Sequence, residues 1–141
     1  MIILKSKKKK NIAEIFKSKG ELYFRKVESQ YLSEVLNSQD AVVSLGGGTP
    51  CYGHNINLIK NSKNASSIYL KASIPNLTER LFLEKDNRPM ISHIVQKEQL
   101  NEFIGKHIFE RRQFYSQSNI TIETDDKTVD EVIEAIVLKL F

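Results

Sequence analysis

The sequence has few of the residues that build covalent or metal-centred scaffolds. It has one cysteine, Cys51, so no internal disulfide can form. Its three histidines, at positions 54, 93 and 107, are not spaced like the ligands of a structural zinc site. No apolar run approaches the roughly 18 residues that cross a bilayer, so we expect no membrane partner. The opening MIILKSKKKK places charge after a short apolar stretch, the reverse of an export signal, which predicts a cytoplasmic protein.

The positive charge comes from one short segment. Five lysines between Lys5 and Lys10 supply the whole excess in the net charge of +4. No aromatic residues are interleaved with them to stack on bases, so we expect a solvated segment and no nucleic acid partner. The length of 141 residues, with 40% hydrophobic and 27% charged residues, predicts a single soluble domain over residues 1–141.

Apolar periodicity and capping residues predict strands that alternate with helices. Helices are expected at 11–19, 21–38, 54–60, 77–85, 97–115 and 129–141, and strands at 41–47, 67–73 and 120–124. Gly20 is expected to close the first helix in a left-handed conformation, and Thr128 with Glu131 forms a capping-box pattern. This order predicts the α/β class, a three-layer α/β/α fold with a mostly parallel sheet covered on both faces.

Three consecutive glycines, Gly46, Gly47 and Gly48, follow the predicted strand 41–47. In open α/β sheets ligands bind beyond the carboxyl ends of the strands, where these glycines should lie. Glycines there allow backbone N–H groups to approach an anionic or polyhydroxylated ligand, and Thr49 adds a donor. A tight turn without a ligand fits the spacing equally well.

Arginines are the second group of candidates, because a planar guanidinium pairs with a carboxylate or phosphate through two hydrogen bonds. Arg25 shares a side of its predicted helix with Glu28, three residues on. Arg88 lies in a polar loop, and Arg111 and Arg112 lie near the end of the helix at 97–115. Each alone also fits an ordinary surface ion pair.

The order of short motifs along the chain resembles the shikimate kinases. FRKVE at 24–28, SLGGG at 44–48, RPM at 88–90 and FERRQFY at 109–115 follow in the order and spacing of that family, from about residue 4 onward. The resemblance implies a P-loop-kinase-like fold, monomeric in the family. It also implies transfer of the γ-phosphoryl group of ATP to the 3-hydroxyl of shikimate with Mg²⁺, in chorismate and aromatic amino acid biosynthesis.

The resemblance also implies roles for individual residues. Arg25 and the three glycines Gly46, Gly47 and Gly48 would hold shikimate, with Glu28 orienting Arg25. Arg111 would bind the shikimate carboxylate, although the family usually reads ER-x-P-x-Y where this chain has Arg112 and Gln113 after Arg111.

Two further roles concern phosphate and metal. Arg88, in a lid region over residues 84–96, would be the catalytic residue that reaches the transferring phosphate and the nucleotide. Ser44 matches a serine beside the magnesium site, which makes it an indirect metal candidate.

The N-terminal part of the sequence differs from the motif pattern of the shikimate kinases. A phosphate-binding loop needs G-x-x-x-x-G-K-[ST], and neither this motif nor the family's D-x-D element occurs in these 141 residues. Either about 30 residues are missing before this sequence, or MIIL is the first strand and an internal segment has been lost. Both readings predict little turnover from this chain alone and an incomplete sheet prone to self-association.

Two alternatives from other functional classes remain. The chain could be a non-catalytic protein that keeps shikimate binding, or a related small-molecule kinase such as a gluconate kinase. The combination of FR-x-x-E, GGGTP and RP motifs favours shikimate over gluconate.

Overall fold

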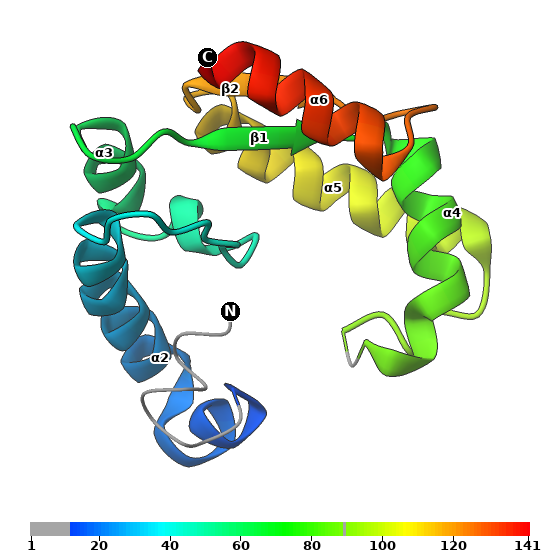
Figure 1. Ribbon diagram of the computed structural model, residues 1–141. Coiled ribbons are helices and arrows are strands. Elements are labelled where there is room, and N and C mark those ends of the chain that lie inside the picture. The colour runs from blue at the N-terminus through cyan, green and yellow to red at the C-terminus, as the bar shows by residue number, and fades with distance from the viewer. Residues whose placement is uncertain (1–11, 89) are drawn as a thin grey trace. The chain divides into compact units, whose positions relative to one another are not determined.

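The computed structural model describes residues 12–88 and 90–141, with the side chains of 12–17 and 87 left aside. The helices are α2 (Ile12–Leu36), α3 (Asn55–Lys60), α4 (Ile74–Glu84), α5 (Lys97–Tyr115) and α6 (Val129–Leu140). The strands are β1 (Ile68–Lys71) and β2 (Ile120–Glu123), and the short 3₁₀ turns are η1 (Thr49–Cys51) and η2 (Lys85–Asn87) (Figure 1). The chain forms two compact units that meet in sequence between Ser67 and Ile68.

The first unit begins with two helical segments joined at a glycine. Gly20 has φ 79° and ψ 171°, which interrupts α2 and confirms the predicted break between two helices. The positive φ is as expected, but ψ is extended, so this is not the left-handed helical conformation predicted. Only glycine adopts this backbone region readily, since it has no Cβ. The predicted cap at Asn11 and the lysine run lie outside the described residues.

The strand predicted at 41–47 is wrong. The segment from Ala41 to Gly46 has no regular secondary structure, and the side chain of Val42 is fully exposed. A strand is stabilised by backbone hydrogen bonds to a neighbouring strand, and this segment pairs with none of the described residues. The apolar, β-branched composition is present, but the partner that would turn it into a buried strand is not among the residues described.

In the second unit β1 and β2 form a parallel pair, as the alternation of strands and helices predicted. The register runs from Ile68 opposite Ile120 to Lys71 opposite Glu123. These two strands make up the sheet within the described residues, and α5 and α6 run alongside them (Figure 1). Beyond the strand ends, the backbone N–H of Thr124 donates to the carbonyl of Lys71 at 2.8 Å.

The core of the second unit lies between α4, α5 and the segment that joins them. Leu100 and Ile104 of α5 are buried against Ile91 and Ile94. Ile91 and Ile94 belong to the predicted lid region 84–96, so these two side chains anchor that region on the core. The side chain of Lys85 also donates to the carbonyl of Ile94 at 3.0 Å.

Two helices of the second unit, α4 and α6, begin at residues that follow capping rules. α4 begins three residues earlier than predicted, because Ser73 accepts a hydrogen bond from the N–H of Asn76 and Pro75 suits the first turn of a helix. At α6 the predicted capping box is confirmed, with the N–H of Glu131 donating to Thr128 and the N–H of Thr128 donating back to the Glu131 carboxylate.

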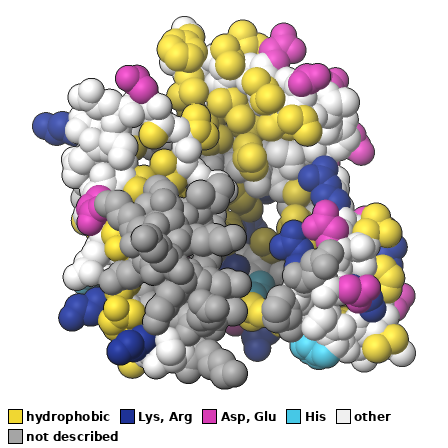
Figure 2. All heavy atoms as spheres, turned by 60° about the horizontal axis from the view of Figure 1, so that its bottom comes forward, with side chains coloured by type: hydrophobic (Ala, Val, Ile, Leu, Met, Phe, Trp, Pro, Cys, Tyr) yellow, Lys and Arg dark blue, Asp and Glu magenta, His cyan; other side chains and the backbone are white. Residues whose placement is uncertain are grey.

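The outer surface of α6 is apolar. Figure 2 shows hydrophobic side chains gathered on one part of the molecule, and the exposed large hydrophobic residues include five from this helix: Val129, Ile133, Val137, Leu138 and Leu140. None of the described helices is both long enough and apolar enough to cross a membrane.

Candidate functional site

The first unit holds an arginine against a buried carboxylate. On α2, Nη1 of Arg25 donates to Oε2 of Glu28 at 2.8 Å, and the Glu28 side chain is 2% exposed. A second, exposed carboxylate, that of Glu21, lies 3.4 Å from Nε of Arg25. A buried carboxylate needs an opposite charge and hydrogen bonds, so this pair fixes both side chains in place.

The other oxygen of Glu28 is satisfied from a different part of the chain. The hydroxyl of Thr49 donates to Oε1 of Glu28 at 2.7 Å, and Thr49 is completely buried. Thr49 begins the turn η1 directly after the glycines, and its N–H donates to the carbonyl of Gly46. The carboxylate therefore links helix α2 to the glycine turn.

The glycine turn lies directly against the guanidinium of Arg25. A Cβ on Gly48 would stand 2.8 Å from Nη2 and 3.1 Å from Nη1 of Arg25. A Cβ on Gly46 would stand 3.2 Å from the hydroxyl of Thr49. Gly48 has φ −84°, an ordinary value, so glycine is needed there for space and not for an unusual backbone conformation. Gly47 is exposed beside this contact.

Aromatic rings complete the surroundings of Arg25. Its Cζ lies 5.4 Å from the centre of the Phe24 ring and 6.0 Å from that of Tyr52, within the range of cation–π attraction. The Arg25 side chain keeps 19% of its surface exposed. The guanidinium is therefore held between a carboxylate, two rings and the glycine turn, with part of the side chain exposed.

The remaining predicted residues have surroundings of their own. Ser44, in the first unit, is exposed. In the second unit Arg88 pairs with Glu84 at 2.9 Å, with both side chains more than half exposed. Arg111 is half-buried on α5, and none of the described carboxylates forms an ion pair with it or with Arg112. The structure thus brings together Arg25, Glu28 and the glycines, while Arg88 and Arg111 are described within the other unit.

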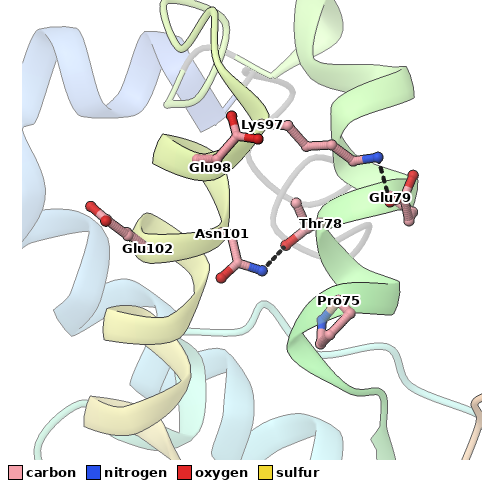
Figure 3. Close-up of a pocket in the computed structure, with 7 residues that line it drawn as sticks. All are labelled: Pro75, Thr78, Glu79, Lys97, Glu98, Asn101 and Glu102. Atoms are coloured by element: carbon pink, nitrogen blue, oxygen red, sulfur yellow. Dashed lines mark hydrogen bonds and ion pairs between the residues drawn. The ribbon is translucent and has the colours of Figure 1, made fainter.

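A cavity of about 380 Å³ in the second unit does not match the predicted site (Figure 3). Its walls are Pro75, Thr78 and Glu79 of α4 with Lys97, Glu98, Asn101 and Glu102 of α5. Lys97 pairs with Glu79, and the amide of Asn101 donates to Thr78 at 3.2 Å. Because its lining residues carry three carboxylates and one ammonium group, this cavity disfavours an anionic ligand.

Hydrogen bonds or burial shift the pKa of some ionisable groups in the second unit. The N–H of Ser73 donates to both oxygens of Asp125, at 3.0 and 3.1 Å, and bonds from Ser73 hold the pKa of Asp125 below its ordinary value. In the α6 capping box, hydrogen bonds from Thr128 lower the pKa of Glu131. Burial raises the pKa of Tyr69 on β1.

Two buried polar residues have roles that the sequence interpretation did not assign. Thr49 was expected to donate to a ligand, but its hydroxyl donates to Glu28 instead. Asn55 was not singled out, although it is completely buried and donates to the carbonyl of Thr49 at 2.8 Å. The sequence did contain a signal for this burial. Asn55 is a polar residue on the same face of the helix at 54–60 as the apolar residues Ile56 and Ile59.

The described residues offer little to a metal ion. Among positions 12–88 and 90–141, no three His, Cys, Asp or Glu side chains lie together as metal ligands. Ser44 contributes one exposed hydroxyl. The chemistry of Arg25 and the close backbone of the glycine turn is of the kind that suits a small anionic or hydroxylated molecule.

Comparison with known proteins shows which family the chain resembles. The shikimate kinase family model matches residues 2–141. A shikimate kinase from Flavobacterium johnsoniae is 42% identical over 127 residues, which cover 89% of this chain and 73% of that protein. Another, from Flavobacterium psychrophilum, is 43% identical over 133 residues, which cover 94% of this chain and 76% of the relative.

Solved structures show the same fold. The shikimate kinase of Bacteroides thetaiotaomicron matches with a TM-score of 0.82 at 27% identity, over 99% of this chain and 77% of that one. The Acinetobacter baumannii enzyme in complex with shikimate matches with a TM-score of 0.77 at 25% identity, over 99% of this chain and 75% of that one. These matches confirm the α/β, P-loop-kinase-like fold. This chain belongs to the shikimate kinase family.

Proposed function

We propose that this chain binds shikimate at Arg25 and the glycine turn, as part of phosphoryl transfer from ATP to the 3-hydroxyl of shikimate. The observation that supports this most is the buried carboxylate of Glu28, which holds Arg25 directly over Gly48. Such an arrangement places a fixed guanidinium beside bare backbone.

The chemistry of Arg25 suits shikimate, a small carboxylate with three hydroxyl groups. Its Nη1 is occupied by Glu28, while Nη2 forms no ion pair with a described carboxylate. The N–H groups of Nη2 are therefore available to ligand oxygen atoms, and Gly47 offers exposed backbone next to them. Glu28 both orients the guanidinium and balances its charge, which leaves affinity for a weakly charged, hydroxylated ligand.

Two further arginines complete the proposal. Arg111 would bind the carboxylate of shikimate, and its lack of an ion pair with any described carboxylate leaves it available for this role. Arg88, in the lid region 84–96, would exchange its exposed partner Glu84 for the transferring phosphate. There it would offset the charge that develops during transfer and help exclude water.

The nucleotide side of the site is not complete in this chain. The family implies ATP as a co-substrate and Mg²⁺ as its usual metal. Ser44 and the other described residues do not form a metal site by themselves, and the sequence contains no phosphate-binding motif. We therefore propose that these 141 residues bind shikimate but turn over little or none of it alone.

The domain organisation, compartment, partners and oligomeric state that we propose are those expected of the family. We propose that residues 1–141 form one shikimate kinase-like domain in the cytoplasm, with shikimate and ATP as its small-molecule partners. A monomer is expected from the family, and self-association through the open edges of the two-stranded sheet is the alternative. Size-exclusion chromatography with light scattering distinguishes the two.

Calorimetric titration of shikimate into the purified chain tests the binding proposal. We expect saturable binding without ATP, and we expect Arg25→Ala to weaken it strongly. Arg112→Ala should leave binding unchanged, because Arg112 is only the neighbour of Arg111, the residue proposed to bind the shikimate carboxylate. The methyl ester of shikimate, which lacks the carboxylate charge, should bind more weakly than shikimate.

A coupled assay for ADP release, with ATP, Mg²⁺ and shikimate, tests the second part. Little or no shikimate-dependent ADP should form. Release of ADP that Arg25→Ala abolishes would contradict the proposed inactivity, while absence of saturable shikimate binding would contradict the binding role itself.

A further inference from the structure

We infer that Thr49 and Asn55 are positioning residues for Arg25. They are two buried polar side chains that fix Glu28, and through it the guanidinium, against the glycine turn. Their relevance to shikimate binding rests on the proposed function. The inference about Arg25 itself rests on the contacts alone.

The first step is the carboxylate of Glu28. At 2% exposure it cannot rely on water, so each oxygen needs a donor from the protein. Oε2 is satisfied by Arg25 and Oε1 by the hydroxyl of Thr49 at 2.7 Å. Without the hydroxyl, Oε1 would gain most by turning toward the guanidinium, which would change the geometry of the ion pair.

The second step is the position of Thr49. Its hydroxyl can serve Glu28 only if the backbone of η1 stays in place. The amide of Asn55 donates to the carbonyl of Thr49 at 2.8 Å, and the hydroxyl of Ser29 donates to Oδ1 of Asn55 at 2.6 Å. Ser29 lies next to Glu28 on α2, so the contacts form a closed loop that begins and ends on the same helix.

The closed loop of contacts explains why the guanidinium of Arg25 and the glycine turn can lie so close together. The contacts run from Arg25 through Glu28, Thr49 and Asn55 to Ser29, and no buried side-chain N or O atom among the described residues lacks a partner. The polar groups hold one arrangement, since any shift of the turn breaks several bonds at once. Arg25 is thereby held in one orientation before a ligand arrives, which lowers the entropy cost of binding.

The chain offers a matched set of variants. Thr49→Val removes the hydroxyl at nearly constant shape, and Thr49→Ser keeps the hydroxyl. Thr78→Val is the control, because Thr78 is also a buried threonine. Its hydroxyl donates to a carbonyl within α4 and accepts from the amide of Asn101, both in the other unit. Of these three changes, only Thr49→Val removes the donor to Glu28.

The first readout needs no ligand. In NMR spectra of the wild-type chain, the Nη–Hη groups of Arg25, assigned by their loss in Arg25→Lys, should give separate, slowly rotating signals. Thr49→Ser and Thr78→Val should keep these signals, and Thr49→Val should average them. Freely rotating Arg25 signals in the wild type would overturn the inference even if Thr49→Val failed to fold.

The second readout is shikimate affinity. Thr49→Val should weaken binding about tenfold, the effect of disturbing one hydrogen bond to a charged group, and Thr49→Ser should restore it. In an Arg25→Ala background Thr49→Val should have no further effect, because Thr49 acts through Arg25. Equal losses in both backgrounds would overturn the inference. If the wild type binds no shikimate, the proposed function fails and the NMR result still decides the role of Thr49.

Discussion

Replacement of Gly48 by alanine is the sharpest test of the contact between the glycine turn and Arg25. The new methyl group would stand 2.8 Å from Nη2, 3.1 Å from Nη1 and 3.3 Å from Cζ of the guanidinium. Carbon and nitrogen atoms do not approach to 2.8 Å without a shift. The backbone at Gly48 has φ −84°, which alanine adopts readily, so the whole effect comes from the side chain.

The magnitude follows from what must move. Either the guanidinium leaves Glu28 or the turn moves away from the guanidinium, and both options weaken a charge-assisted hydrogen bond to a carboxylate that is 2% exposed. Such bonds contribute about 1.5–3 kcal/mol. Since 1.4 kcal/mol corresponds to a factor of ten, shikimate affinity should fall by about ten- to a hundredfold. The free energy of unfolding should fall by a similar amount or less.

Gly53→Ala is the matched control for this experiment. Gly53 has φ +53° and no atom within 4 Å of the position of a Cβ, so alanine there costs about 1 kcal/mol of backbone strain and touches nothing. Calorimetric titration and thermal unfolding of both variants separate the two effects. We expect Gly53→Ala to lower stability and leave affinity unchanged. Equal shikimate affinity for Gly48→Ala and the wild type would refute the close contact described here.

Three further predictions concern the second unit. Leu100→Ala should lower the free energy of unfolding by about 3 kcal/mol, measured by denaturant titration, because Leu100 is completely buried in the core. Asp125→Asn should flatten the loss of stability in acid. The bonds from Ser73 lower the pKa of Asp125 in the folded state. The contribution of Asp125 to the free energy of unfolding is therefore complete above the ordinary aspartate pKa of about 4, and it is lost as the pH falls through the lowered pKa. Denaturant unfolding of both proteins from pH 6 to pH 2 checks this prediction. Arg111→Ala should weaken shikimate binding at least tenfold while Arg112→Ala leaves it unchanged, and equal effects in calorimetry would contradict the assignment.

Apolar periodicity and capping residues were sufficient to predict most of the helices and strands from the sequence. The helix predicted at 97–115 matches α5 residue for residue, and the capping box at Thr128 and Glu131 forms as expected. The predicted strands at 67–73 and 120–124 contain β1 and β2. These features depend on residues close in sequence, or on alternation that any buried parallel strand shows, so they can be recognised from the sequence.

The strand predicted at 41–47 failed for the opposite reason. Strand formation there needs a partner from elsewhere in the chain, and composition cannot supply one. The same limit applies to the site. The spacing of Arg25 and Glu28 predicted their ion pair, but the contact with Gly48 and the buried role of Asn55 depend on how α2, the glycine turn and α3 pack together. The motif indicated which residues matter, and the packing explains why.

The pairing of β1 with β2 also has a consequence for how the second unit folds. The strands join residues 52 positions apart, such as Lys71 and Glu123, so they can meet only after a long loop of chain has closed. That loop contains α4 and α5, whose core of Ile91, Ile94, Leu100 and Ile104 is built from residues much nearer in sequence. The helical pair is therefore expected to form first and to bring the strands together, because local contacts form before distant ones. Parallel pairing of the strands would then be the late, slow step of folding.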